Sequence, residues 1–228
     1  MTIALFVTVG VQTKIDFGKG GAKKRKRRRG PRPGPHPRTA HRARPQHDAR
    51  HPVHVTLRAK RGLPSLREQR VFELLNRLVQ APNIVGFQVV HYSIQHDHLH
   101  LIVEAEDRRA LSRGVRSLEI RFAKRLNARL GRKGPLWGDR YHRHDLRSPR
   151  EVRNALVYVL LNIKKHAGHR GIVVDELSTA DAFDGWAVRP RSPPHTVPPV
   201  IRPPMTWLLD KGWKKLGLLR LEESPRVS

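Results

Sequence analysis

The sequence contains no cysteine among its 228 residues. This absence excludes disulfide bonds and zinc sites built on thiolates, which are common anchors of small domains. Any metal ion held by this chain must therefore be bound by histidine, asparagine, glutamine or carboxylate side chains.

Acidic residues and long apolar runs are also scarce. The chain has 19 Asp and Glu against 46 Lys and Arg, which leaves a net charge of +27. Such a charge predicts a polyanionic partner, with nucleic acid first and an anionic membrane surface second. No apolar run approaches the roughly 18 residues of a transmembrane helix, and the apolar start of the chain lacks the basic beginning of a signal peptide. We therefore expect a cytoplasmic protein that binds nucleic acid and does not enter the membrane.

Residues 1–50 are predicted to form a basic, disordered arm. They hold 14 Lys and Arg against two Asp, hence +12, and little apolar surface to build a core. Seven consecutive cations are followed by a stretch rich in glycine and proline, which forms neither a helix nor a central strand. We expect the seven cations to bind DNA phosphates without sequence preference. They are Lys23, Lys24, Arg25, Lys26, Arg27, Arg28 and Arg29.

The rest of the chain divides into a folded domain over residues 51–170 and, over residues 171–228, a proline-rich linker with an amphipathic tail. Alternating apolar residues predict strands, and apolar residues at helical spacing predict helices. The expected strands cover residues 54–59, 86–94, 97–104 and 136–146, and the expected helices cover residues 66–80, 112–130 and 149–166. This order predicts an α+β fold with a ferredoxin-like antiparallel sheet, helices on one face, an open opposite face, and an added C-terminal helix.

Two histidines of the third expected strand are the first candidates for a metal site. His98 and His100 flank one apolar residue, so both point to one face of the strand while Leu99 points into the core. A second triplet of this form, His142-Arg143-His144, is the weaker candidate, because its central arginine is typical of an exposed edge segment. His96 is expected beside the pair rather than as a ligand.

A tyrosine of the last expected helix is the candidate nucleophile. Asn154, Tyr158 and Asn162 follow at intervals of four residues and form a polar stripe along one helix face. Asparagine is a poor residue for a helix interior, so this stripe favours a functional role. The other two tyrosines lie in expected strands without such a stripe. Glu104 lies about 13 Å beyond His100 along its strand, too far to join the same metal.

The histidine pair, the tyrosine and the amide together indicate a metal-assisted tyrosine nucleophile that attacks a phosphodiester. The same motifs resemble the single-tyrosine HUH transposases of bacterial insertion sequences, in particular the REP-associated tyrosine transposases. The similar segments are HVTL at His54–Leu57, GLPS at Gly62–Ser65, HLHLIVE at His98–Glu104, GDRYH at Gly138–His142, and PREVRNAL at Pro149–Leu156 with Tyr158 and Asn162.

The resemblance implies that His98 and His100 bind Mg²⁺ or Mn²⁺, that Tyr158 is the catalytic nucleophile, and that Asn162 helps to hold the metal. It also implies cleavage and rejoining of hairpin-flanked single-stranded DNA through a 5′-phosphotyrosine. One departure is Asp97, since the residue before the pair is usually asparagine in these transposases.

On the domain itself, we expect Arg140 and Arg153 to contact the DNA. The chain contains no nucleotide-binding loop. This agrees with a covalent intermediate that conserves the energy of the cleaved bond.

Three other functions are also consistent with the high positive charge. A non-catalytic nucleic-acid-binding protein of ferredoxin-like fold usually stacks bases on aromatic residues of its sheet, but aromatic residues make up only 6% of this chain. A basic ribosome-associated protein would need neither Tyr158 nor His98. A copy that serves its host on chromosomal repeats would use the same site as a mobile transposase, and the sequence is compatible with both a monomer and a homodimer.

Overall fold

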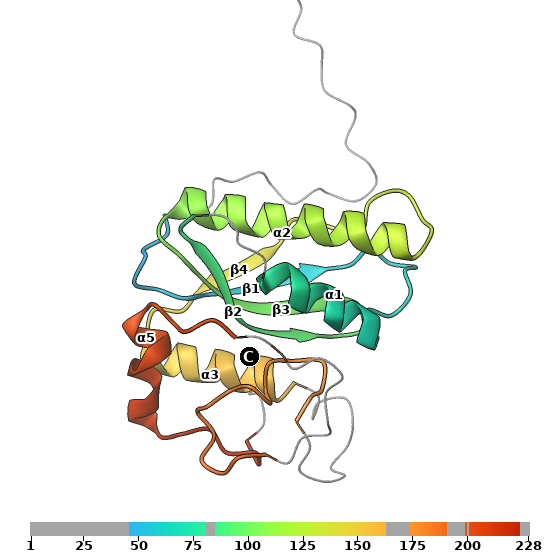
Figure 1. Cartoon of the computed structure of the whole chain (residues 1–228). Coiled ribbons are helices and arrows are strands. Elements are labelled where there is room, and N and C mark those ends of the chain that lie inside the picture. The colour runs from blue at the N-terminus through green and yellow to red at the C-terminus, as the bar shows by residue number, and fades with distance from the viewer. Residues whose placement is uncertain (1–45, 81–84, 163–173, 191–198, 200, 224–228) are drawn as a thin grey trace, which may run out of the picture. The chain divides into compact units, whose positions relative to one another are not determined.

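The protein is built on a four-stranded antiparallel sheet with the strand order β2-β3-β1-β4 (Figure 1). The computed structural model describes residues 46–80, 85–162, 174–190, 199 and 201–223. The strands are β1 (Val53–Arg58), β2 (Phe87–Ile94), β3 (His98–Ala105) and β4 (His142–Asp145). The helices are α1 (Gln69–Gln80), α2 (Arg108–Arg129), α3 (Pro149–Leu160), α5 (Trp207–Asp210) and the 3₁₀ helix η1 (Gly212–Leu216). The predicted α+β fold of the ferredoxin-like kind is confirmed.

Helices α1 and α2 cover one face of the sheet and enclose the larger core (Figure 1). Side chains alternate along a strand, so the odd-numbered residues of β1 and β3 point to this face. The buried strand residues are Val53, Val55, Leu57, Leu99, Leu101 and Val103. Among the described residues, no helix is both long enough and apolar enough to cross a membrane.

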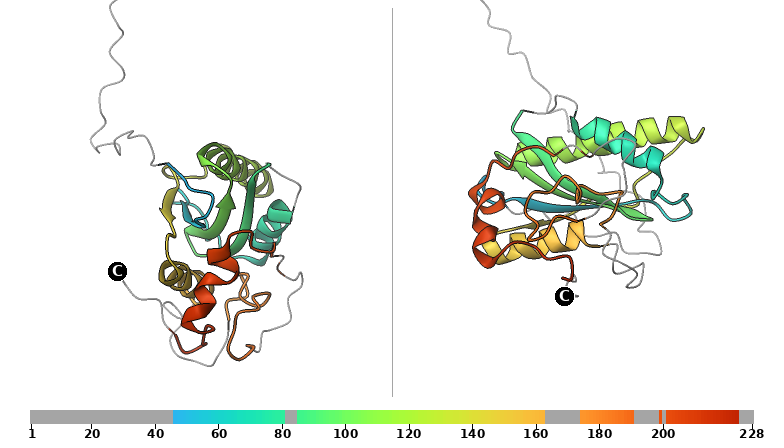
Figure 2. Two further views of the ribbon diagram at one scale, coloured as in Figure 1. Left: turned by 90° about the vertical axis from the view of Figure 1, so that its left-hand side faces the viewer. Right: turned by 60° about the horizontal axis from the view of Figure 1, so that its bottom comes forward.

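The opposite face is not open, as we had predicted, because α3 and the described part of the tail cover it (Figure 2). A second buried cluster joins Val152 and Leu156 of α3 to Leu209 and Trp213 of the tail. Both segments are amphipathic, and each buries its apolar side against the other and against the sheet. The candidate site therefore lies under a helix and not on an exposed sheet.

The predicted helix and strand boundaries need four corrections. Helix α1 begins at Gln69 rather than at residue 66. Helix α2 begins at Arg108 rather than at residue 112, because the Asp107 side chain accepts a hydrogen bond from the Ala110 N–H and caps the helix. The strand predicted over residues 136–146 is confined to β4. Helix α3 ends at Leu160 rather than at residue 166.

The start of α3 was predicted correctly. The Ser148 hydroxyl accepts a hydrogen bond from the Glu151 N–H at 3.2 Å, and Pro149 occupies the first helical position. This cap determines where α3 begins. It thereby determines which of its residues face the sheet.

A buried carboxylate on β3 holds the tail in place. Glu104 is fully buried and accepts hydrogen bonds from the Gln88 amide at 2.7 Å, the Met205 N–H at 2.8 Å, and the Thr206 N–H and hydroxyl at 2.8 and 2.7 Å. A buried charge is costly unless its hydrogen-bonding capacity is filled. Three of the four donors come from the tail, so the carboxylate and the docked tail depend on each other.

Replacing Glu104 by glutamine is expected to lower the free energy of unfolding by about 1–3 kcal/mol. The new amide N–H₂ is a donor, so it cannot accept the hydrogen bonds that one carboxylate oxygen accepted. Urea unfolding followed by tryptophan emission measures the change. Glu106→Gln is the matched control, since it removes the same charge from an exposed position two residues later. Equal unfolding midpoints for the two variants would contradict the anchoring role of Glu104.

Candidate active site

The pairing of β1 with β3 gathers the polar residues under α3. Thr56 stands opposite His100, and His54 stands opposite Ile102, two residues farther along β3. Opposite residues on antiparallel strands point to the same side of a sheet. His54 and Thr56 therefore lie beside His100, on the face that α3 covers.

Tyr158 of α3 lies against these side chains. Its ring centroid is 4.8 Å from that of His100 and 5.6 Å from that of His54, and both contacts are edge-to-face. The structure thus brings together three groups that are far apart in the sequence.

The two predicted metal ligands converge through their ring nitrogens. His98 Nε2 lies 2.9 Å from His100 Nε2, with the rings nearly perpendicular. Two ligands at neighbouring positions of an octahedral ion, with bonds of about 2.1 Å, stand about 3 Å apart. The spacing therefore fits two imidazole nitrogens that share one divalent cation.

The outer nitrogens of the pair are held by neighbouring groups. His98 Nδ1 donates to Asp97 Oδ1 at 2.6 Å, and His100 Nδ1 lies 3.2 Å from both Thr56 Oγ1 and His54 Nε2. A hydrogen on each Nδ1 leaves each Nε2 with its lone pair, which is the form that binds a metal. The hydrogen bond from His98 also lowers the pKa of the Asp97 carboxyl. The departure noted in the sequence therefore places an anion directly behind His98.

His54 is a site residue that the sequence analysis did not single out. Burial, and then the nearby His142, His144 and His98, lower the pKa of His54 to about 4, so its ring is neutral at pH 7. A neutral ring whose own hydrogen is on Nδ1 can accept a hydrogen from His100 Nδ1, which lies 3.2 Å from His54 Nε2. His54 belongs to the HVTL match, but it is 46 residues from His100, and only strand pairing connects them.

The stripe on α3 runs from the surface into the protein. Asn154 is exposed, Tyr158 is partly buried, and Asn162, just beyond the helix, is only 2% exposed. The Tyr158 ring is held by the two edge contacts with histidines. The Tyr158 hydroxyl forms no hydrogen bond with any described residue, so its oxygen is available to a substrate.

The amide of Asn162 has an oxygen in need of a partner. Asn162 Oδ1 is buried and accepts no hydrogen bond from the described part of the chain. A buried carbonyl oxygen without a partner costs free energy, and a cation would supply one. No group of three His, Cys, Asp or Glu among the described residues is arranged to hold a metal, so a third ligand of the amide type stays a prediction.

The other histidines that the sequence offered have different surroundings. His142 and His144 lie exposed on the edge strand β4, opposite Thr56 and His54. The central Arg143 is not exposed, as that ranking assumed, but forms an ion pair with Asp145 at 2.8 Å with only 7% of its side chain exposed. The preference for the first triplet stays a prediction. His96 lies 3.0 Å from the Ser65 hydroxyl through its Nδ1 and is not part of the pair.

The predicted DNA-binding cations differ in what they contact. Arg140 is exposed. Arg153 donates to both carboxylate oxygens of Glu223 at 2.6 and 2.8 Å, and to the Gly217 and Leu218 carbonyls at 3.2 and 3.3 Å. Its guanidinium is thus committed to the tail, although DNA binding by both arginines stays a prediction. Residues Lys23–Arg29 lie outside the described residues.

Comparisons with known proteins connect the folded part of the chain to transposases. Residues 49–159 match the family model described as "Transposase IS200 like", a range that includes His98, His100 and Tyr158 but ends before Asn162. A solved REP-associated tyrosine transposase bound to a REP hairpin is similar at 15% sequence identity and a TM-score of 0.44, over 57% of this chain and 75% of that chain. No curated protein matched.

Replacing Asp97 by alanine is expected to weaken Mn²⁺ binding about 10- to 100-fold, because His98 loses the partner that orients its ring and holds its hydrogen on Nδ1. Calorimetric titration of Mn²⁺ into the protein measures the affinity. Asp210→Ala is the control, since it removes the same charge from a tail residue that, within the described segments, pairs only with Lys211 at 3.9 Å. An affinity equal to that of the control would contradict the role given to Asp97.

Proposed function

We propose that this protein cleaves and rejoins hairpin-flanked single-stranded DNA, a proposal supported by the match of residues 49–159 to the family model of IS200-like transposases. The nucleophile is Tyr158, and the product of the first step is a 5′-phosphotyrosine. His98, His100 and Asn162 hold the metal ion that assists the reaction.

The contact between Tyr158 and His100 carries this proposal. A tyrosine that served only the core would bury its ring among apolar side chains. Tyr158 packs against the second apolar cluster, but its ring also lies edge-on to two histidines, and its hydroxyl is free of hydrogen bonds within the described residues. A phenol oxygen beside a pair of convergent imidazoles is the arrangement that tyrosine attack on phosphorus requires.

The proposed reaction balances without an external energy source. The Tyr158 oxygen forms a bond to phosphorus, and the bond from phosphorus to the 3′ oxygen breaks. The phenol loses one proton and the departing 3′ oxygen gains one, so that a free 3′-hydroxyl is released. The phosphotyrosine retains the energy of the phosphodiester, and attack by a 3′-hydroxyl reverses the step and rejoins the strand.

Each residue of the site has a separate task. Asp97 and His54 hold the outer nitrogens of the histidine pair, which keeps both Nε2 lone pairs directed to one place. Mg²⁺ or Mn²⁺ bound there would neutralise the charge of the phosphate and polarise it for attack. The cap of α3 at Ser148 sets the position of Tyr158 relative to the pair.

The covered site favours a single strand as the substrate. The scissile phosphate must enter between the histidine face of the sheet and α3, where Tyr158 already contacts His100. A single strand can be splayed into such a space more easily than a stacked duplex. The expectation that a hairpin lies beside the cleavage site rests on the resemblance of the sequence motifs to those of the transposases.

Wild-type protein mixed with labelled hairpin DNA from the flanks of its own gene is expected to form a covalent adduct in the presence of Mn²⁺ or Mg²⁺. Tyr158→Phe removes the attacking oxygen and His100→Ala removes a metal ligand, so both variants should form at least 100-fold less adduct. Denaturing gel electrophoresis measures the adduct.

Tyr141→Phe is the matched control for this experiment, because it removes a phenol oxygen from a tyrosine packed against the larger core. Its adduct should equal that of the wild type. Binding of the hairpins without any adduct would refute the enzymatic proposal and favour a non-catalytic nucleic-acid-binding protein.

Replacing the seven cations Lys23–Arg29 by glutamine is expected to flatten the salt dependence of single-strand binding. Each lost phosphate contact reduces the slope of log affinity against log salt by about 0.7, so the total change is up to about 5. Titrations at several salt concentrations measure the slope, and the adduct assay at saturating DNA should remain unchanged. An unchanged slope would refute phosphate binding by this run.

A further inference from the structure

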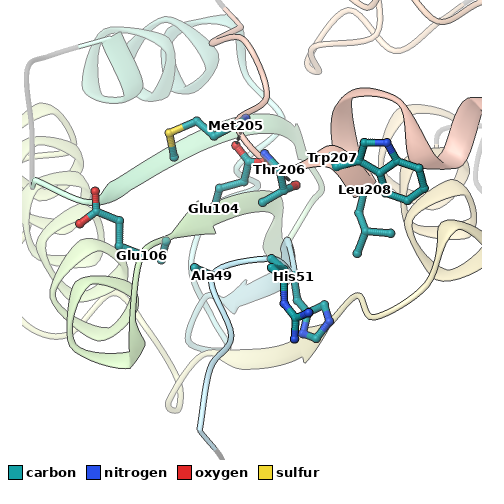
Figure 3. Close-up of a pocket in the computed structure, with 10 residues that line it drawn as sticks. Ala49, His51, Glu104, Glu106, Met205, Thr206, Trp207 and Leu208 are labelled. Atoms are coloured by element: carbon teal, nitrogen blue, oxygen red, sulfur yellow. Dashed lines mark hydrogen bonds between the residues drawn. The ribbon is translucent and has the colours of Figure 1, made fainter.

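A pocket of about 560 Å³ opens at the end of β3 remote from the histidine pair (Figure 3). It is formed by three segments that are distant in the sequence. Residues 49–51 precede β1, residues 104–106 end β3, and residues 205–208 begin the docked tail. Pockets of 300 to 1,000 Å³ with mainly apolar walls are typical of small-ligand sites, so the volume suits about one nucleotide.

Two large apolar side chains of the tail line this pocket while exposed to solvent. Met205 is 60% exposed and Trp207 is 51% exposed, although their neighbours Leu208 and Leu209 are buried. Neither side chain is buried in the second apolar cluster, and both line the pocket. Exposed tryptophan and methionine side chains are effective surfaces for flat, polarizable ligands.

The indole of Trp207 is held in place from behind. A Cβ added at Gly212 would lie 2.7 Å from the ring, so only glycine allows the indole this close approach. The Lys215 ammonium lies 5.0 Å from the ring centroid, in cation–π contact. These two contacts therefore fix the position of the indole, with the Lys215 ammonium over the ring.

The charged groups around the pocket are suited to a nucleotide. The side chain of Arg50 is 84% exposed, and because its Nε and Nη2 donate to Asp48, its Nη1 is the nitrogen left to donate to a phosphate. Glu106 is exposed at the other side and offers a carboxylate that accepts from the amino or imino hydrogens of a base. The Glu104 carboxylate already accepts four hydrogen bonds, so it is not available to a ligand in the pocket.

The position of the pocket relates it to the candidate active site. Glu104 lies on β3 four residues beyond His100, on the same face of the sheet, which corresponds to about 13 Å at strand rise. A single strand whose phosphate lies at Tyr158 can cover this distance with a few nucleotides.

We propose that this pocket binds one unpaired nucleobase of the DNA, stacked against Trp207 and Met205. The proposal rests on the function proposed above, because the base belongs to the same single strand that Tyr158 attacks. Stacking supplies affinity with little sequence preference, since every base has a π-face. Glu106 adds a preference for bases that donate hydrogen bonds.

The test uses Tyr158→Phe protein, in which the DNA stays intact, and hairpin oligonucleotides with 2-aminopurine at successive positions of the single-stranded flank. Stacking in the pocket should quench the fluorescence at one position of the flank. Trp207→Ala should abolish this quenching and weaken binding about 5- to 100-fold, whereas Trp207→Phe should retain most of both. Leu218→Ala is the matched control, because it truncates an exposed apolar residue of the same tail outside the pocket.

Thermal melting establishes that each variant is folded, and Met205→Ala provides a second test of the stacking surface if Trp207→Ala is unstable. Quenching at no position, or quenching that survives both variants, would overturn the proposal. Equal quenching after the flank is paired with a complementary strand would also overturn it. These outcomes do not depend on adduct formation, so a failure of the base pocket is distinguishable from a failure of the tyrosine chemistry.

Discussion

The register between β1 and β3 is the constraint on which the candidate site depends. It places Thr56 opposite His100 and lets His54 reach the outer nitrogen of the same imidazole. A slip of one residue would turn every side chain of β1 to the other face of the sheet. Val53, Val55 and Leu57 would then leave the larger core, so the burial of these residues protects the geometry of the histidines. The stability of the sheet and the arrangement of the site are consequences of one pairing.

The covering of the histidine face follows from this arrangement. Polar side chains on a sheet cannot form a dry core with each other, so α3 and the tail bury their own apolar residues around the site. Buried polar anchors then hold the covering segments to the sheet. Glu104 binds the start of the described tail, and Arg67 forms an ion pair with the fully buried Asp175 at 2.8 Å. The described residues 174–190 and 201–223 thus cover the candidate site together with α3.

Much of the arrangement of the candidate site could be predicted from local patterns. The alternation around His98 and His100 predicted a shared strand face, and the cap at Ser148 predicted the start of α3. Residues whose role depends on a distant partner escaped this reasoning. No local sequence pattern around His54 indicates its contact with His100. Likewise, none around Arg153 indicates its ion pair with Glu223, 70 residues away. Glu104 was predicted to lie too far from His100 to share a metal, but its role as an anchor depends on a tail that approaches from elsewhere in the chain.

By itself, the sequence determined the order of the strands and helices, marked the histidine pair and the tyrosine as candidates, and set the net charge of +27 from which a polyanionic partner is predicted. Hydrophobic periodicity, capping residues and net charge are properties of neighbouring residues or of the whole composition, so they can be read without coordinates. Only the tertiary structure decided that the histidine face is covered, that Asp97 and His54 hold the pair, and that the tail presents Met205 and Trp207 at a pocket. Those features depend on strand register and on packing between segments far apart in the chain, which no local pattern records.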